Sequence, residues 1–250
     1  MVARNTLAAV HFLLLLAIPA RADWRVTSSE TEKSSAPGIE HRRIALADGG
    51  AEATLDLALF PAKSAAVRVI DNPDGAELAS VMRRTRGLAG VNGRYFDPEN
   101  APVGLVISDG KIIAPFRKAK LLSGVMAITK GRLELLRSGE YSSRKNVMTA
   151  LQCGPFLVEG GKAVPGLNGA RSARRTFVLT GGTDRAAIGY CSSVTLAQLG
   201  EILATPDLKV QRALNFDGGS SSAFWFNGEG GVVSIPEYKT VRNFVVVGSK

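Results

Sequence analysis

Short stretches in which apolar residues alternate with polar or small ones make up most of this chain. Residues 39–46, 53–60 and 66–70 have this period of two, which predicts half-buried β-strands. Glycine-containing turns that can take positive φ predict further hairpins. These turns lie at 108–111, 130–131, 159–162 and 181–184, and strands over 210–216 and 242–247 bring the predicted total to about ten.

Two segments have the spacing of helices instead. Within 76–86 the residues Leu78, Val81 and Met82 fall three and four apart, which predicts an amphipathic helix with a basic C-terminal end. A second helix is expected over 195–203, with Ser192 or Ser193 as its N-cap. Two helices against this many strands predict an α+β fold, a single domain of mixed β-sheets with a few helices packed against them.

The N-terminal residues form the pattern of an export signal. Arg4 precedes an apolar run over 7–18 that is too short to span a bilayer, and small residues at Ala20 and Ala22 suit a signal peptidase. We therefore expect residues 1–22 to be a signal peptide, with an uncleaved membrane anchor as the alternative. No later segment is apolar enough to span, so the mature protein is expected to be secreted or periplasmic, without a transmembrane segment.

The mature chain has two predicted parts. Residues 28–38 are polar and without periodicity, so 23–38 is expected to be a flexible N-terminal arm. Residues 39–250 have ordinary apolar content and no Pro-rich or Ser-rich linker, which suits one domain with a sizeable core. Neither a repeat nor an oligomeric state can be inferred from this pattern.

The protein is basic. Loss of Arg4 and Arg21 with the signal peptide, and of no acid, lowers the formal charge from +9 to +7. A basic surface favours anionic partners such as acidic or phosphate-bearing glycans. Export argues against nucleic acid as the partner. The alternative is that the spread-out Lys and Arg residues only keep the protein soluble.

Few residues are available for metal or triad chemistry. The mature chain has Cys153, Cys191 and one histidine, His41, which is too few for a zinc site. In an oxidising compartment the two cysteines are expected to form a disulfide, with two free buried thiols as the alternative. His41 lies at the edge of the first predicted strand and is expected to be a solvated surface residue rather than a catalytic base.

Four segments combine turn glycines with acids, amides and arginine. They are 92–97 (Asn-Gly-Arg-Tyr-Phe-Asp), 152–158 (Gln-Cys-Gly-Pro-Phe-Leu-Val), 174–176 (Arg-Arg-Thr) and 215–222 (Asn-Phe-Asp-Gly-Gly-Ser-Ser-Ser). In the last of these a buried strand runs directly into Asp217, Gly218 and Gly219. Successive amides in such a glycine turn can form a nest for a phosphate or carboxylate. The structural alternative is a hairpin whose Asp and Ser side chains close the turn.

In their order and spacing the four segments resemble the phosphodiester glycosidase family. The resemblance covers roughly 87–247 and is closest at Asn215, Asp217, Gly218, Gly219, Ser221 and Ser222, with direct matches at Gly154-Pro155 and Arg175-Thr176. Two positions depart from the family pattern: Arg94 replaces a small or apolar residue and Arg174 replaces a proline. Both departures are cationic, which favours a more anionic substrate.

The resemblance implies hydrolysis of a sugar-1-phosphodiester at the bond between the anomeric carbon and oxygen, with release of free sugar. In this interpretation Arg175 pairs with the phosphate, Asp217 acts as nucleophile or base, and Asp97 is the second carboxylate, with Glu159 as a weaker candidate. Substrate-binding residues are expected at Asn92, Gly93, Arg94, Gly154, Thr176, Asn215, Gly218, Gly219, Ser220 and Ser221.

Two other functions remain open at this point. One is a metal-assisted phosphodiesterase in which Asp97, Asp217 and asparagine side chains bind Mg²⁺ or Ca²⁺, although no cofactor is firmly implied. The other is a catalytically silent domain that binds a glycan or another envelope polymer, because a fold alone does not establish turnover.

Overall fold

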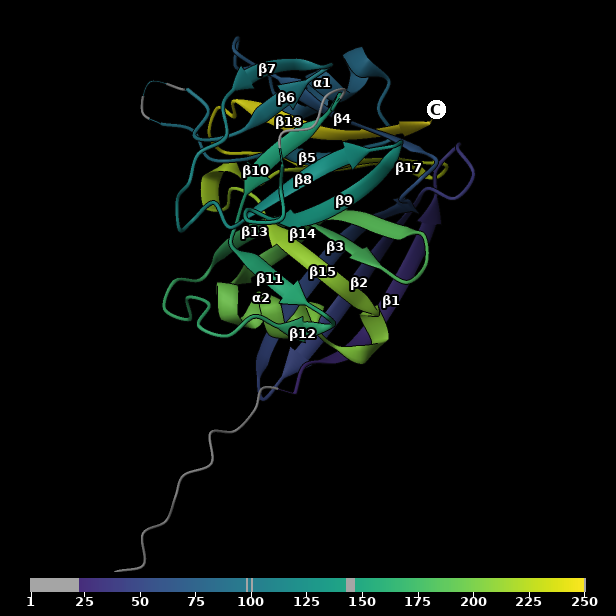
Figure 1. Ribbon diagram of the computed structural model, residues 1–250. Helices are drawn as coiled ribbons and strands as arrows, with labels where there is room; N and C mark the ends of the chain where they lie inside the picture. Colours follow the sequence, from purple (N-terminus) through teal and green to yellow (C-terminus); the bar gives the residue numbers. More distant parts are fainter. Residues whose placement is uncertain (1–22, 98, 100, 143–146, 250) are drawn as a thin grey trace, which may run out of the picture.

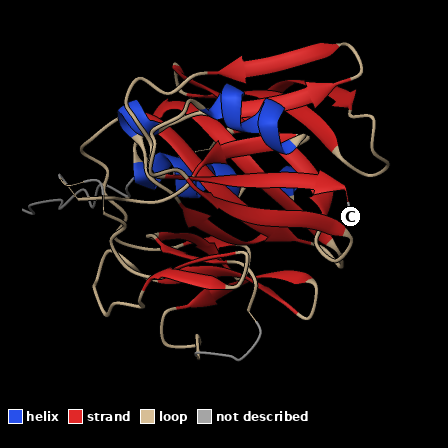
Figure 2. Ribbon diagram, turned by 90° about the horizontal axis from the view of Figure 1, so that it is seen from above, coloured by secondary structure: helices blue, strands red, loops and turns tan. Residues whose placement is uncertain are grey.

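A computed structural model describes residues 23–97, 99, 101–142 and 147–249. The predicted signal peptide, 1–22, lies outside the described residues. Strands make up most of the described chain (Figure 2). They are β1 Arg25–Lys33, β2 Glu40–Asp48, β3 Ala51–Pro61, β4 Ala65–Asp71, β5 Ala89–Asn92, β6 Val106–Ser108, β7 Lys111–Ala114, β8 Gly124–Thr129, β9 Arg132–Arg137, β10 Ala150–Cys153, β11 Phe156–Glu159, β12 Lys162–Ala163, β13 Ala173–Gly181, β14 Arg185–Val194, β15 Val210–Asn215, β16 Phe224–Gly228, β17 Gly231–Ile235 and β18 Asn243–Ser249.

The strands form three sheets. An eight-stranded sheet has the order β1-β2-β3-β14-β13-β15-β11-β12 and occupies the lower half of Figure 1. Two five-stranded sheets, β7-β6-β10-β8-β9 and β17-β16-β5-β18-β4, occupy the upper half. The middle of β13 is buried on both faces, which explains its uninterrupted apolar run Phe177-Val178-Leu179.

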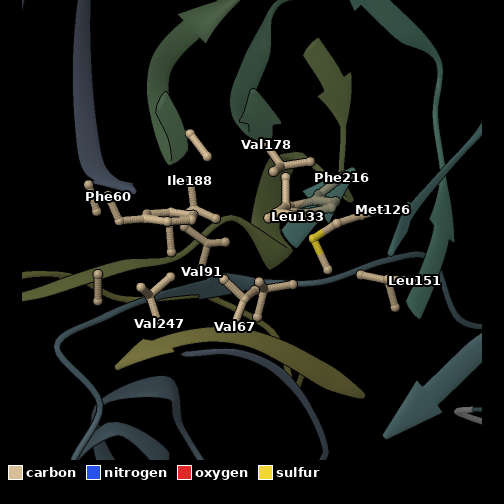
Figure 3. Packing of buried hydrophobic residues seen from close by; sticks show 14 of the residues in the cluster. Phe60, Val67, Val91, Met126, Leu133, Leu151, Val178, Ile188, Phe216 and Val247 are labelled. Atoms are coloured by element: carbon tan, nitrogen blue, oxygen red, sulfur yellow. The ribbon is translucent and has the colours of Figure 1, made fainter. Parts of the chain in front are cut away.

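The largest apolar cluster lies where the three sheets meet (Figure 3). Phe60, Val178 and Ile188 come from the eight-stranded sheet, and each five-stranded sheet contributes its own apolar residues. The contributions labelled in Figure 3 are Met126, Leu133 and Leu151 from one five-stranded sheet and Val67, Val91 and Val247 from the other. One continuous core therefore joins the sheets and holds the strand ends that carry the motifs in fixed relative positions.

The two helices cover outer faces. α1, Leu78–Thr85, buries Leu78, Val81 and Met82 against the sheet that contains β5. α2, Leu196–Leu203, packs on the far face of the eight-stranded sheet from the common core. Its N-cap is Thr195, which forms a capping box with Gln198, so the prediction of Ser192 or Ser193 as the cap is wrong. Both serines belong to β14 or its end, because that strand continues to Val194.

The predicted fold class is confirmed only in its coarse form. The helices, strands and all four predicted hairpin turns are present, yet the described chain has eighteen strands and is predominantly β. Mixed sheets were predicted, but every pairing among the described strands is antiparallel. β16 and β17 were not predicted, because β16 begins with three consecutive buried residues and β17 is mostly exposed, so neither shows a clear period of two.

The polar segment near the N-terminus is a strand rather than the expected flexible arm. β1 pairs along its length with β2, and its side chains are mostly exposed because only one face of this outer strand meets the protein. β1 also changes the setting of His41 on β2. His41 is buried, its Nε2 lies 2.9 Å from Asp56 Oδ1, and its ring packs against Phe224 and Phe226. The prediction of a solvated histidine is therefore wrong.

The two cysteines are free, so the predicted disulfide is wrong. Cys153 on β10 belongs to the cluster where the three sheets meet, whereas Cys191 on β14 faces the cluster under α2. The eight-stranded sheet thus separates the two thiols. No helix in the described part of the chain is long and apolar enough to span a membrane.

Candidate active site

The end of β15 presents the central acid. β15 lies between β13 and β11, and its last residue is Asn215. Phe216 then inserts its ring into the common core, while its amide donates to the Thr176 carbonyl oxygen at 2.9 Å. Because Phe216 anchors the chain, Asp217 follows at a defined position outside the core. The Asp217 amide donates to the carbonyl oxygen of Gly93 at 2.9 Å, which joins the last motif to the first.

Asn92 and Thr176 hold the main chain of Asp217. The Asn92 Nδ2 donates to the Asp217 carbonyl oxygen at 2.8 Å, and its Oδ1 accepts from the Ala223 amide at 3.1 Å. The Thr176 hydroxyl lies 2.8 Å from both Asn92 Oδ1 and the Asp217 carbonyl oxygen. Both side chains are fully buried. Their hydrogen bonds position Asp217, and neither side chain reaches the surface of the site.

Asn215, Tyr95 and Gly154 form a second buried group beside this one. The Tyr95 hydroxyl donates to the Gly154 carbonyl oxygen at 2.9 Å, and Asn215 Nδ2 lies 3.3 Å from each of these oxygens. Asn215 Nδ2 also donates to the carbonyl oxygen of Phe216. Gly93 is required for a steric reason, since a Cβ there would collide with Oδ1 of Asn243. All four motifs therefore converge on the chain around Asp217.

A cavity of about 400 Å³ opens above this network. Asp217 and Arg175 line it together, and volumes of this order suit small-molecule sites. The other lining residues are Tyr95, Phe96, Arg171, Ala173, Gly218, Gly219, Ser220, Ser221 and Lys239. The protein has a larger hollow, of about 670 Å³, at Trp24, Lys162 and Glu201, but it contains none of the motif residues. We place the site in the smaller cavity for that reason.

Asp217 is the carboxylate of the cavity, and its surroundings act on its pKa in both directions. Burial raises the pKa of Asp217 above its ordinary value. The Ser221 hydroxyl and the Gly218 amide, which donates to Oδ1 at 2.9 Å, oppose this rise, as does the positive charge of Lys239. The net result is a raised pKa for a carboxyl group in a partly dehydrated place, where charge interactions are strong.

Arg175 lines the same cavity as Asp217. Its Nε donates to the Val194 carbonyl oxygen at 3.1 Å and its Nη2 to that of Arg171 at 2.7 Å. A Cβ on Gly218 would lie 3.3 Å from Nη1, so that nitrogen is directed toward the glycine turn. Burial lowers the pKa of Arg175. Two nitrogens thus fix the guanidinium plane, and one remains directed toward the turn.

The other proposed acids lie elsewhere. Asp97 caps a turn, accepting from the Ala101 amide at 2.8 Å through Oδ1, and is not among the residues that line the cavity. Glu159, at the end of β11, forms ion pairs with Arg137 and Arg212, which hold its pKa below the ordinary value. Within the described residues the structure therefore brings Asp217, and neither Asp97 nor Glu159, to the cavity.

The two cationic departures from the family pattern do not line the cavity either. Arg94 is fully buried, and its three guanidinium nitrogens have no hydrogen-bond partner among the described residues. Arg174 ties the last motif to the loop before β18 by donating to the carbonyl oxygens of Ser222 and Pro236, and it lies 4.0 Å over the Tyr238 ring. Direct contact of Arg94 with the substrate, as expected from the sequence, has no support in this geometry.

Lys239, Arg171 and Phe96 line the cavity and were not selected from the sequence. Lys239 lies in the loop before β18, with its Nζ 5.2 Å from the centre of the Phe96 ring. No sequence pattern distinguishes a single lysine in a polar loop as a site residue. Only folding brings Lys239 to the cavity that contains Asp217. Arg171 could have been noticed from its position four residues before Arg175. The described residues contain no group of three His, Cys, Asp or Glu side chains that could hold a metal ion.

Comparisons with known proteins agree with this geometry. The family model of the phosphodiester glycosidases matches residues 85–247, although no curated protein matches the sequence. The catalytic domain of zebrafish N-acetylglucosamine-1-phosphodiester alpha-N-acetylglucosaminidase, auto-inhibited by its pro-peptide, has a similar fold. Its TM-score is 0.62 at 19% identity, over 89% of this chain and 88% of that chain.

Two bacterial structures share the fold as well. A hypothetical protein from Synechocystis has a TM-score of 0.66 at 14% identity, over 85% of this chain and 62% of that one. A putative exported protein from Burkholderia pseudomallei has a TM-score of 0.57 at 11% identity, over 78% and 74%. The family match covers well over half of the chain and all four motifs. This protein therefore belongs to the phosphodiester glycosidase family of glycosidase-type hydrolases.

Proposed function

We propose that this protein is an exported hydrolase that cleaves a sugar-1-phosphodiester at the bond between the anomeric carbon and its oxygen. It would release free sugar from a phosphoglycan or a related envelope polymer and leave the phosphate on the acceptor. The observation that carries this proposal is the shared cavity of Asp217, Arg175 and Lys239, in which one carboxylate lies among three described cations, the third being Arg171. The basic charge of the chain suits an anionic substrate.

The residues suit a phosphate leaving group. The departing phosphate monoester is a much weaker base than a sugar alkoxide, so its departure needs little help from a general acid. One carboxylate in the cavity is then sufficient. Arg175, with Lys239 beside it, would bind the phosphate oxygens and stabilise the charge that develops as the C–O bond breaks. The amides of the Gly218–Gly219 turn supply further donors for the same anion.

Asp217 would act at the anomeric carbon. As a nucleophile it would form a bond to that carbon while the phosphate leaves with the electrons of the C–O bond, and water would then release the sugar. As a base it would take a proton from a water molecule that attacks the carbon directly. Asn92 and Thr176 hold the Asp217 main chain, so we assign them a positioning role in either case.

Hydrolysis in water enriched in heavy oxygen tests the proposal. An N-acetylglucosamine-1-phosphodiester is a suitable first substrate, because it is the substrate in the name of the zebrafish enzyme that shares the fold. We expect the label on the sugar and none on the phosphate. We expect Asp217→Asn to lose about 1,000-fold or more in kcat while it keeps its thermal unfolding temperature.

Two results would contradict the proposal. Label on the phosphate would place cleavage at phosphorus, and full activity of the folded Asp217→Asn variant would exclude the assigned acid. Asp97→Asn is the matched control, because Asp97 is also an aspartate in a motif turn but does not line the cavity. Its activity is expected to stay within about threefold of the parent protein.

A further inference from the structure

A basic segment lies beside the candidate active site. Residues 115–121 (Pro-Phe-Arg-Lys-Ala-Lys-Leu), which we call the basic rim, connect β7 to β8 without forming either helix or strand. Arg117, Lys118 and Lys120 are exposed, and within the described chain none of them forms an ion pair. Leu121 at its end is 72% exposed. The rim contains no acid to neutralise these charges.

The rim is held in place by Gln152 of β10. The Arg117 amide donates to Gln152 Oε1 at 3.1 Å, and Gln152 Nε2 donates to the Arg117 carbonyl oxygen at 2.6 Å. Gln152 is fully buried, so these bonds fix the rim main chain to the sheet. The lysines on the rim are therefore presented from a defined backbone rather than from a loose loop.

The rim ends directly against the motif that borders the cavity. A Cβ on Gly154 would collide with the carbonyl oxygen of Leu121, so the two chains are in close contact. The Gly154 carbonyl oxygen accepts the hydrogen bond of Tyr95, which lines the cavity together with Asp217. The rim is thus linked to the cavity lining through Gly154 and Tyr95.

A buried arginine lies near the rim. The guanidinium of Arg94 is buried without a hydrogen-bond partner among the described residues. Burial lowers its pKa to about 10, and the charge of nearby Arg117 contributes to the decrease. The charge of Arg94 adds to that of the exposed rim residues, and positive charge of this kind favours an anion in front of the rim.

We propose that the basic rim binds a second phosphate group of the substrate, one repeat away from the bond that is cut. The enzyme would then prefer a polymer joined by sugar-1-phosphodiesters over a single such unit. This inference rests on the proposed function and deepens it, since it selects the polymeric member of the substrate class. The cavity of about 400 Å³ would hold the terminal sugar and its phosphate, and the next phosphate would lie outside it over Lys118 and Lys120.

Charge reversal tests the rim against a matched control. The test variant is Lys118→Glu/Lys120→Glu, and the control is Lys130→Glu/Lys162→Glu. Both control lysines are exposed at hairpin turns away from the site. Lys130 follows β8, at the end of that strand opposite to Gly124, the residue that pairs with Cys153. Lys162 follows the turn after β11. The two variants change the net charge equally, so they differ only in place.

The substrates are N-acetylglucosamine-1-phosphate methyl ester and a short oligomer of the same unit joined by phosphodiesters. We expect the ratio of kcat/KM for the oligomer to that for the single unit to fall about tenfold in the rim variant and to stay at the parent value in the control. The salt dependence of oligomer hydrolysis should also weaken in the rim variant. An unchanged ratio, or an equal fall in the control, would overturn the inference.

Binding separates this inference from the proposed function. The oligomer is titrated into the Asp217→Asn protein with the rim or the control lysines reversed. Weaker binding in the rim variant alone would support the rim as a phosphate subsite. This conclusion would hold even if the parent protein hydrolysed neither substrate. Absence of hydrolysis would refute only the proposed function. Equal binding by both variants would refute the rim subsite, whatever the activity.

Discussion

At the scale of residues, Asp217 is the group on which the proposed chemistry depends. Its position is set by bonds to its main chain, from Asn92 and Thr176, while its charge is set by contacts of its side chain. Burial raises the pKa, and Ser221, Gly218 and Lys239 oppose the rise. Substitutions can therefore alter the position and the charge of Asp217 separately. A change of charge is measured in the pH dependence of kcat/KM, and a change of position in kcat.

The pH dependence of kcat/KM reports the charge of Asp217. Either role for this residue needs the ionised carboxylate, so activity should rise as the pH rises through its pKa. Because that pKa is raised, the acidic limb should lie above the value of an ordinary aspartate, about 3.9. Lys239→Met removes a charge that lowers the pKa and should move the limb to still higher pH. In the control Lys162→Met the acidic limb should not move. An acidic limb that does not move in Lys239→Met either would contradict this explanation.

Thr176→Val tests the position of Asp217. Valine keeps the shape of the buried threonine but removes the hydroxyl that lies 2.8 Å from the Asp217 carbonyl oxygen. We expect kcat to fall about tenfold with little change in KM, and the free energy of unfolding to fall by about 1–2 kcal/mol. Thr180→Val on the same strand is the control, because residue 180 lies away from the cavity. Equal kinetic effects of the two substitutions would exclude a positioning role for Thr176.

At the scale of elements, strand pairing decides the environment of each candidate residue. The sequence predicts β2 as the first strand, which would leave His41 at an edge. β1 pairs with β2 and makes it internal, and Phe224 and Phe226 of β16 cover the ring of His41, which is therefore a buried partner of Asp56. β1 was missed because its exposed polar side chains show no period of two, and its pairing depends on main-chain hydrogen bonds that any sequence can make.

The cysteines provide a test at this scale. Cys153 and Cys191 lie in different sheets and in different apolar clusters, and burial raises the pKa of Cys191 to about 12 and that of Cys153 further. The native protein should therefore show no thiol that reacts with Ellman's reagent at neutral pH, and both should react after unfolding without a reductant. Reductant should leave the unfolding temperature unchanged. Absence of free thiol in the unfolded protein would instead indicate a disulfide.

At the scale of the whole molecule, the three sheets bring together segments that are far apart in the chain. Asn92 belongs to one five-stranded sheet, Gly154 follows a strand of the other, and Asp217 follows a strand of the eight-stranded sheet. The common core between the sheets fixes these strand ends relative to one another. The site is therefore a property of the packed molecule, since each segment alone is an ordinary turn.

The sequence by itself determined the family, the two helices and the main hairpins, and it selected Asp217, Arg175 and the glycine turn as candidate site residues. These are local features, encoded in periodicity, in turn glycines and in motif order. The tertiary structure decided what depends on packing. It placed Asp97 and Glu159 outside the cavity, brought Lys239 into it, buried Arg94 without a hydrogen-bond partner among the described residues and separated the two cysteines. Neighbours that are distant in sequence determine burial and charge, and so no local pattern could predict them.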